Sequence, residues 1–410
     1  MIKLIFIVLL VLDYGYKLLR LFLTARQRKK PLPQSVNNIY DKAQYSRWLE
    51  YQTACLRLET VKATVRFALM LLLFSTNLFS QIASQFSAGE YGTQCLLLCF
   101  YFLLIGLLEV PFYYISQFKI EAKYGMNRCT IKTFLVDCIK SFVLNAGLHS
   151  LVCVLYIWVH SALKAHALWI SSLIAVAIYV VMMIFSSWIT RIDNKLTPLE
   201  NGTLRDRLTQ MFSGYHLKDI YVMDASKRTT RANAACTGMG KLKKIVLYDN
   251  LVNDYTEDEI VAVFAHELAH FKNRDSLKIT LFSIAYILLF NAVICSFFYL
   301  PQISMAFGFA GSSSALAVLT VMESDVFGVV NVLWQAATSA FIRPMEIRAD
   351  ALAADYGYGE AMISFFRKAV QKELGDLNPH PILIAMEDEH PPIHKRIEAI
   401  SARISAKNLT

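Results

Sequence analysis

The sequence predicts a mainly α-helical membrane protein that crosses a bilayer about seven times and carries a cytoplasmic α+β portion. Three observations support this fold class. The 410 residues are 55% hydrophobic and 18% charged, against roughly 45–50% and 25% in average soluble domains. Several apolar windows reach the about 20 residues that span a bilayer, and basic residues gather in alternate loops. This composition excludes a disordered chain, a coiled coil and a small disulfide-rich scaffold.

The candidate spans divide the chain into two regions. The N-terminal region, 1–190, contains spans at 4–23, 67–83, 95–118, 142–163 and 168–189, and the region 191–410 contains two more, near 279–300 and 315–342. The first and last spans are the weakest, because each contains charged residues. In the first, Asp13 and Lys17 can form an ion pair one helical turn apart. In the last, Glu323 and Asp325 either face water within the membrane or lie at its surface.

The charge of the loops orients these spans. The loops after the first and third spans are rich in Lys and Arg, whereas 84–94 and 301–314 contain none. The positive-inside rule therefore places 191–276 and 343–410 in the cytoplasm. Since this bias accounts for the net charge of +9, we expect no nucleic-acid partner. The eight cysteines form no C-x-x-C pair, and we interpret them as small buried hydrophobic residues.

The most informative motif lies at 266–270 and reads His-Glu-Leu-Ala-His. A capping box at Thr256 and Glu259 begins a helix ahead of it. On that helix His266 and His270 share a face, so both imidazoles can bind one Zn²⁺. Glu267 lies beside them and can hold and deprotonate a water at the metal. The alternative is a pair of exposed histidines on a charged helix, which the flanking apolar residues oppose.

Two further segments can complete such a site, which takes three protein ligands and leaves one position open. In the helix after Pro344, Glu346 can be the third ligand, while Asp350 can accept a hydrogen bond from the far nitrogen of a ligand histidine. Alternatively, both are solvated carboxylates. Farther on, His390 and Arg396 can polarise the scissile carbonyl and stabilise its oxyanion. The alternative there is a surface helix begun by prolines.

These motifs, in this order and among seven apolar segments, resemble those of the type I CAAX prenyl proteases, multi-pass zinc metalloproteases of the gluzincin group. The resemblance extends over nearly the whole chain and includes the runs 26–28, 120–127, 197–199, 226–228, 233–234 and 244–249. It implies seven helices around a membrane chamber and one Zn²⁺ held by His266, His270 and Glu346. It also implies Glu267 as the general base.

The same resemblance implies how a substrate binds. His390 and Arg396 would contact the substrate carbonyl, and Asp350 would orient a ligand histidine. Asn233 and Ala234 would lie on an exposed strand that pairs with the substrate backbone; ordinary pairing with a strand near 245–248 is the alternative. The partner would be a peptide or protein, with the cut removing three residues after an isoprenylated cysteine.

One departure from the family bears on substrate class. Ala269 stands where the family usually has glycine, and the run 271–275 is similar to that of heat-shock membrane proteases, which degrade damaged membrane proteins. A quality-control endopeptidase, a transporter or channel, and an inactive zinc-binding homologue are therefore the alternatives, although transport does not require this zinc motif. The departure and the compact length favour a bacterial cytoplasmic membrane, whereas the resemblance implies the endoplasmic reticulum membrane in a eukaryote. The sequence does not fix the oligomeric state.

Overall fold

Long helices dominate the structure. The computed structural model describes residues 1–86, 88–213, 219–237, 244–309 and 327–409. Within these ranges, seven helices have 24 residues or more, and one corresponds to each predicted span. They are α1 (Ile2–Gln27), α2 (Lys42–Ser75), α4 (Gly89–Tyr114), α5 (Ile131–Leu163), α6 (Ala167–Asp193), α10 (Asp275–Phe298) and α13 (Gly328–Asp355).

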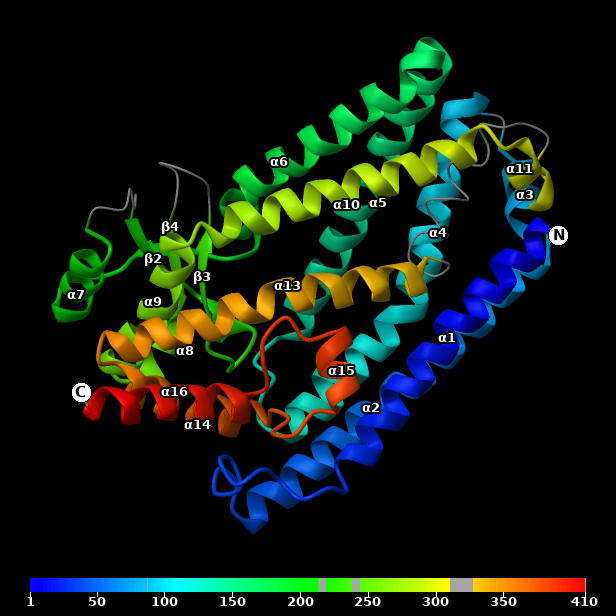
Figure 1. Cartoon of the computed structure of the whole chain (residues 1–410). Helices are drawn as coiled ribbons and strands as arrows, with labels where there is room; N and C mark the ends of the chain where they lie inside the picture. Colours follow the sequence, from blue (N-terminus) through cyan, green and yellow to red (C-terminus); the bar gives the residue numbers. More distant parts are fainter. Residues whose placement is uncertain (87, 214–218, 238–243, 310–326, 410) are drawn as a thin grey trace.

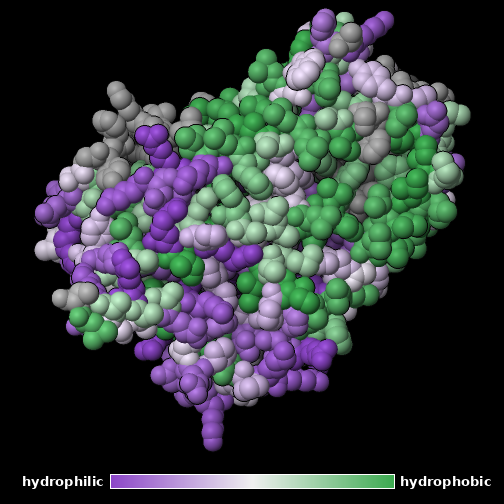
Figure 2. Space-filling model, in the orientation of Figure 1, coloured by the Kyte–Doolittle hydropathy of each residue, from purple (hydrophilic) through white to green (hydrophobic). Residues whose placement is uncertain are grey.

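Four of these helices are long and apolar enough by themselves to cross a membrane: α4, α5, α6 and α10. α1 contains the predicted ion pair between Asp13 and Lys17, at 2.6 Å. Large apolar side chains such as Leu107, Leu173 and Leu289 are exposed on the long helices. In Figure 2 the apolar surface gathers over these helices, whereas hydrophilic surface covers the end that carries the C-terminus. This division is that of a membrane-spanning protein.

Two of the predicted spans differ from the helices observed. The span 67–83 is not continuous, because Thr76 adopts an extended conformation that ends α2, and a short helix α3 (Leu78–Ala83) follows. A capping box at Asp41 begins α2, so this helix extends far beyond the apolar window. Within the described residues, the span 315–342 corresponds to the beginning of α13, which starts at Gly328 and continues beyond the predicted span. Glu323 and Asp325 lie outside the described residues.

The seven helices form a closed ring. Each packs against the next in the order α1, α2, α4, α5, α6, α10 and α13, and α13 packs back against α1 (Figure 1). Such a ring encloses an interior, as the family resemblance implies. Two helices of the ring, α10 and α13, also pack against α9 (Glu257–Lys272), which contains the His-Glu-Leu-Ala-His motif. The ring and this motif are therefore joined directly.

A small mixed sheet lies beside α9. Its strands are β1 (Leu196–Pro198), β2 (Asp219–Met223), β3 (Ala234–Thr237) and β4 (Lys244–Tyr248), in the order β1-β2-β4-β3. β2 and β4 are parallel, and the other two pairs are antiparallel. α7 (Thr203–Met211) and α8 (Asp249–Asp254) flank the sheet, and their apolar residues join it to α9 in one core cluster.

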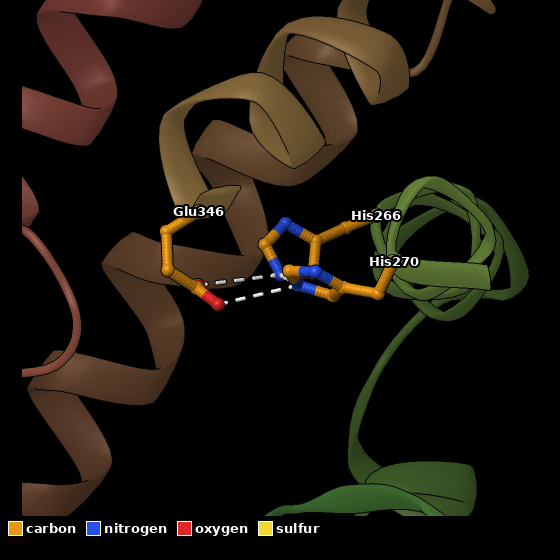
Figure 3. Close-up of side chains that lie close together, drawn as sticks. All are labelled: His266, His270 and Glu346. Carbon is orange, nitrogen blue, oxygen red and sulfur yellow. Dashed lines mark hydrogen bonds and ion pairs between the residues drawn. The ribbon is translucent and has the colours of Figure 1, made fainter. Parts of the chain in front are cut away.

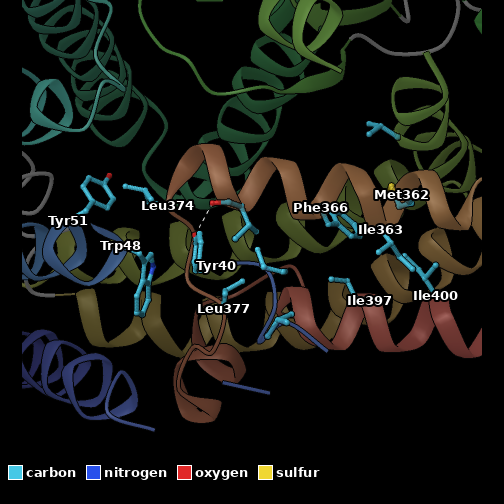
Figure 4. Packing of buried hydrophobic residues seen from close by; sticks show 14 of the residues in the cluster. Tyr40, Trp48, Tyr51, Met362, Ile363, Phe366, Leu374, Leu377, Ile397 and Ile400 are labelled. Atoms are coloured by element: carbon cyan, nitrogen blue, oxygen red, sulfur yellow. Dashed lines mark hydrogen bonds between the residues drawn. The ribbon is translucent and has the colours of Figure 1, made fainter. Parts of the chain in front are cut away.

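A second core cluster fixes the other side of α9. It joins α9 to α14 (Gly359–Glu373), α16 (Ile393–Asn408) and the segment 36–51. Figure 4 shows Tyr40 and Trp48 from the N-terminal half packing near Leu374 and Leu377 from the C-terminal half. The Tyr40 hydroxyl donates a hydrogen bond to the carbonyl of Val370 at 2.9 Å. The core therefore crosses the predicted boundary at 190/191.

Candidate active site

The helix that carries the zinc motif is held rigidly. Thr256 and Glu259 form the predicted capping box, and the Glu259 carboxylate also accepts hydrogen bonds from Ser364 and Lys368 of α14. Most residues of α9 are buried, because core clusters cover it on two sides. The alternative of two exposed histidines on a charged helix is therefore wrong. A helix fixed in this way sets the direction of the side chains on its free face.

Three side chains from two helices converge on one point. His266 and His270 of α9 bring their Nε2 atoms to 3.2 Å from each other. Glu346 of α13 places Oε1 at 3.2 Å from Nε2 of His270 and Oε2 at 3.4 Å from Nε2 of His266 (Figure 3). These residues are the one group of metal-ligand type found among the described residues.

Two carboxylates hold the opposite nitrogens of the histidines. Nδ1 of His266 lies 2.9 Å from Oδ1 of Asp350, and Nδ1 of His270 lies 3.0 Å from Oδ2 of Asp275. A carboxylate accepts, so each Nδ1 carries the hydrogen and each Nε2 presents its lone pair to the common point.

The converging atoms are therefore all acceptors. Oε2 of Glu346 is buried and has no hydrogen-bond partner. A buried set of two imidazole lone pairs and one carboxylate is stable only with a cation between them. Two imidazoles and a carboxylate are also an established donor set for a catalytic metal. The residues fit a metal ion.

The electrostatics of the group agree with this. Burial opposes protonation of His266, but the nearby carboxylates of Asp350 and Glu346 outweigh it and raise its pKa to about 9. Burial would raise the pKa of Glu346, but the two histidines hold it well below its usual range. Burial would also raise the pKa of Asp350, but hydrogen bonds, chiefly from Arg396, lower it. The surroundings thus favour positive charge at Nε2, which a proton or a metal ion can supply.

Asp275 was not among the residues predicted for the site. It is 1% exposed and also accepts two hydrogen bonds from Arg348, at 2.8 and 2.9 Å. It reaches His270 because the chain turns sharply after α9, where Arg274 adopts a positive φ of 54°. An acid five residues after the second histidine was a signal in the sequence, but a regular helix would have directed it to another face.

Arg396 and His390 approach the same group from the C-terminal segment. Nε and Nη2 of Arg396 each donate to Asp350 at 2.7 Å, and the guanidinium stacks over Phe366. Nη2 lies 3.7 Å from Oε2 of Glu346, and Nε2 of the exposed His390 lies 3.4 Å from the same oxygen. Both predicted residues therefore lie at the site, and Arg396 in addition holds Asp350.

Glu267 lies on α9 between the two histidines and is half-buried. Its carboxylate makes no hydrogen bond or ion pair with any described residue.

Asn233 and Ala234 occupy an edge of the sheet. Ala234 pairs with Leu247 of β4, and the carbonyl of Asn233 accepts from the amide of Tyr248 at 2.9 Å. Among the described strands, β3 has a neighbour on this side alone. Asn233 is exposed and lines a pocket of about 550 Å³ together with Arg231 and Glu373. The ordinary pairing thus occurs on one edge of β3, and no described strand pairs with its other edge.

Comparison with known proteins decides the family. A family model described as peptidase family M48 matches residues 198–404, which is half of the chain. The chain belongs to peptidase family M48. A second model, described as CAAX prenyl protease N-terminal with five membrane helices, matches 22–195. The resemblance noted from the sequence is thereby confirmed, and this M48 chain is a membrane metallopeptidase.

Individual relatives agree with the family models. The CAAX prenyl protease 1 homolog of Oryza sativa subsp. japonica is 30% identical over 309 residues, which cover 73% of this chain and 71% of the relative. CAAX prenyl protease 1 of Saccharomyces cerevisiae is 29% identical over a region that covers 74% of this chain and 71% of the yeast protein. The crystal structure of S. mikatae Ste24p has the same fold, with a TM-score of 0.89, 23% identity, and coverage of 98% of this M48 chain and 99% of its own. These relatives are eukaryotic and give the expectation of a bacterial membrane no support.

Proposed function

We propose that this M48 peptidase is a zinc endopeptidase that cleaves near the C-terminus of prenylated CAAX proteins or peptides. The observation that carries the proposal is the convergence of His266, His270 and Glu346, from α9 and from α13 of the closed ring of membrane helices. The substrate class is supported by the relatives, which are called CAAX prenyl proteases. Two imidazoles and a carboxylate suit zinc, which would bind one per chain.

Zinc, when bound, would polarise the scissile carbonyl and lower the pKa of a water toward about 7. Glu267 takes the proton of that water as it attacks and returns it to the leaving amine. His390 and Arg396 donate hydrogen bonds to the oxyanion that develops. Asp350 and Asp275 keep the ligand histidines in the required tautomer.

The peptide would bind in an extended form along the open edge of β3. An edge strand offers unpaired N–H and C=O groups, so main-chain hydrogen bonds at Asn233 and Ala234 would fix the register of the substrate. Such pairing is independent of side chains, which fits a site that accepts different residues after the cysteine.

The basic loops support a site on the cytoplasmic side of the membrane. The eukaryotic relatives support the endoplasmic reticulum as that membrane. We also propose that the chain is organised as a membrane region, 1–190, and a metallopeptidase region, 191–410, that share a core.

The test is a choice between substrates. The purified full-length chain is offered a farnesylated CAAX peptide, the same peptide without the lipid, and an unfolded membrane protein, and its zinc content is measured. We expect about one zinc per chain and a clear preference for the farnesylated peptide. Preference for the unfolded protein would indicate quality control, as the run 271–275 suggests. Absence of zinc would exclude a hydrolase of this type, and zinc without cleavage would indicate an inactive homologue.

A further inference from the structure

The interior of the helix ring contains an apolar pocket far from the catalytic residues. We propose that this pocket, between α5, α6 and α10, binds the isoprenoid chain of the substrate. The inference rests on the proposed function, because it assigns a place to the lipid which that function requires.

The pocket has the size and lining of a lipid site. Its volume is about 300 Å³, at the lower end of the roughly 300–1,000 Å³ of small-ligand cavities. Its wall is mostly aliphatic and aromatic, with contributions from Val152, Cys153, Ala175, Ile287, Phe290 and Ile294. The Tyr156 hydroxyl at its edge donates to Asn291, whose amide donates to Ser171 and Ser172. Hydrogen bonds within the protein thus occupy these polar groups. His149 also lines the pocket, with Nδ1 2.8 Å from the carbonyl oxygen of Asn145, and the rest of the wall is mostly apolar.

The pocket faces the inside of the ring. Cys153 is 2% exposed and belongs to a core cluster that also contains Phe6 of α1, Met70 of α2 and Leu97 of α4. Ile294 of α10 packs against the same cluster. These helices stand at different places around the ring, so residues that meet them must point inward. The cluster fills the interior at the end of α10 remote from Asp275.

An aromatic strip between α10 and α13 leads to the pocket. Phe282 of α10 stacks on Phe341 and Trp334 of α13, with ring centroids 5.0 and 4.4 Å apart. Tyr286, which lines the pocket, stacks on the same Trp334 at 4.7 Å. Glu346 follows Phe341 by five residues on α13. The strip therefore begins roughly 7.5 Å before Glu346 along α13 and ends at the pocket.

The distance suits a long hydrocarbon chain. Tyr286 is eleven residues beyond Asp275 on α10, which corresponds to about 16 Å along the helix. No amino-acid side chain at a scissile bond extends so far. A linear isoprenoid on the cysteine before that bond does have this shape, and the stacked rings offer it a continuous apolar surface.

A pocket on the other side of the ring, also lined by described residues, is less suited to a lipid. A pocket between α1, α2 and α4 is lined by charged residues, namely Lys17, Arg20, Glu59, Lys62, Arg66 and Glu109. A hydrocarbon chain placed there would remove charged groups from water without replacing their hydrogen bonds. The charge distribution therefore favours α5, α6 and α10 for the lipid.

The test fills the pocket and varies the lipid. Ala175→Phe narrows the cavity, and Ala177→Phe adds the same ring at an exposed position of the same helix. Peptides with C10, C15 and C20 isoprenoids and an unprenylated twin are compared by kcat/KM. Because one methylene in an apolar pocket changes specificity by about 10-fold or more, we expect Ala175→Phe to lower cleavage of the C15 and C20 peptides at least tenfold relative to C10. Cleavage of the unprenylated peptide should stay at the wild-type level, and Ala177→Phe should keep the wild-type profile.

A second measurement needs no variant. A CAAX peptide with a photoreactive group at the end of its isoprenoid is crosslinked to the wild-type chain, and we expect the label on α5, α6 or α10. The inference would be wrong if the label were found only on other helices. It would also be wrong if Ala175→Phe left the dependence of kcat/KM on isoprenoid length unchanged. In both cases the proposed function would stand as long as the wild type still preferred the prenylated peptide. Loss of that preference in the wild type would instead overturn the proposed function.

Discussion

Nδ1 of His270 donates a hydrogen bond to Oδ2 of Asp275 at 3.0 Å, across the turn that joins α9 to α10. The same carboxylate binds Arg348 of α13. One buried acid therefore connects the zinc motif to both ring helices beside it, and it fixes the tautomer in which His270 can bind a metal.

Replacing this acid should weaken metal binding. Asp275→Asn removes the charge that holds the Nδ1 hydrogen and leaves the shape intact, so we expect a 10- to 100-fold loss of zinc affinity. Titration with a competing chelator measures it. Asp258→Asn, an exposed acid on α9, serves as the control and should keep wild-type affinity. Equal affinity in all three proteins would show that the contact has no effect on the metal.

Glu267→Gln should separate metal binding from catalysis. The amide cannot accept the proton of the attacking water, so we expect turnover to fall by about 10²- to 10⁴-fold while the zinc content stays at the wild-type level. Glu360→Gln, an exposed glutamate on α14, should leave both unchanged. Retained turnover in Glu267→Gln would remove this residue from the role of base.

Arg396→Lys should affect the metal as well as the substrate. A lysine cannot make the two parallel hydrogen bonds that Arg396 donates to Asp350. We therefore expect both the zinc affinity and kcat/KM to fall, each by about tenfold or more. A lower kcat/KM at wild-type zinc affinity would instead restrict Arg396 to the substrate carbonyl.

The loop before His390 should be a determinant of turnover. Arg343 of α13 donates to the carbonyls of Ile384 and Asp388, at 2.7 and 3.1 Å. Without these hydrogen bonds the loop that carries His390 is less restrained. Small displacements of catalytic groups lower the rate by up to about 10²-fold. Arg343→Ala should therefore lower kcat by tenfold or more with little change in KM. In a background of His390→Ala the same change should have little further effect. Additive losses would show that Arg343 acts elsewhere.

Low pH should weaken the hydrogen bonds and ion pair by which Glu259 of α9 binds Ser364 and Lys368 of α14. Burial would raise the pKa of Glu259, but hydrogen bonds from Lys368, Ser364 and the Thr256 backbone outweigh it and lower it. The stabilisation is therefore present above the unfolded pKa of about 4.3 and is lost as the pH falls through the lower folded value. Glu259→Gln should cost about 1.5–3 kcal/mol at pH 7, seen as a lower Tm. The difference from the wild type should shrink below about pH 4; a constant difference would contradict the role of the charge.

The sequence predicted the features that repeat or follow a short spacing. Seven apolar windows predicted seven long helices, and the i,i+4 histidines with Glu346 predicted three residues that the structure brings together. The extent of α2 could not be predicted, because its N-terminal half is polar and its helix depends on a cap at Asp41.

Contacts that depend on a turn or on packing between elements could not be predicted from the sequence either. Asp275 binds His270 only because of the turn at Arg274, and Arg343 holds the His390 loop only because α13 packs beside it. The spacing of Asp275 from His270 was a signal in the sequence, but no pattern encodes the turn that brings the two side chains together. The contact of Arg343 depends on the packing of the C-terminal segment against α13.

The core cluster that contains Tyr40 and Trp48 together with Leu374 and Leu377 has a consequence for how the chain acquires its shape. Its N-terminal members are synthesised more than 300 residues before their partners. Their apolar surfaces therefore stay exposed until the C-terminal helices have been synthesised. Neither half therefore has a complete core of its own. Two separate polypeptides, broken near residue 190, should each be unstable alone and should regain activity only when both are made in the same membrane.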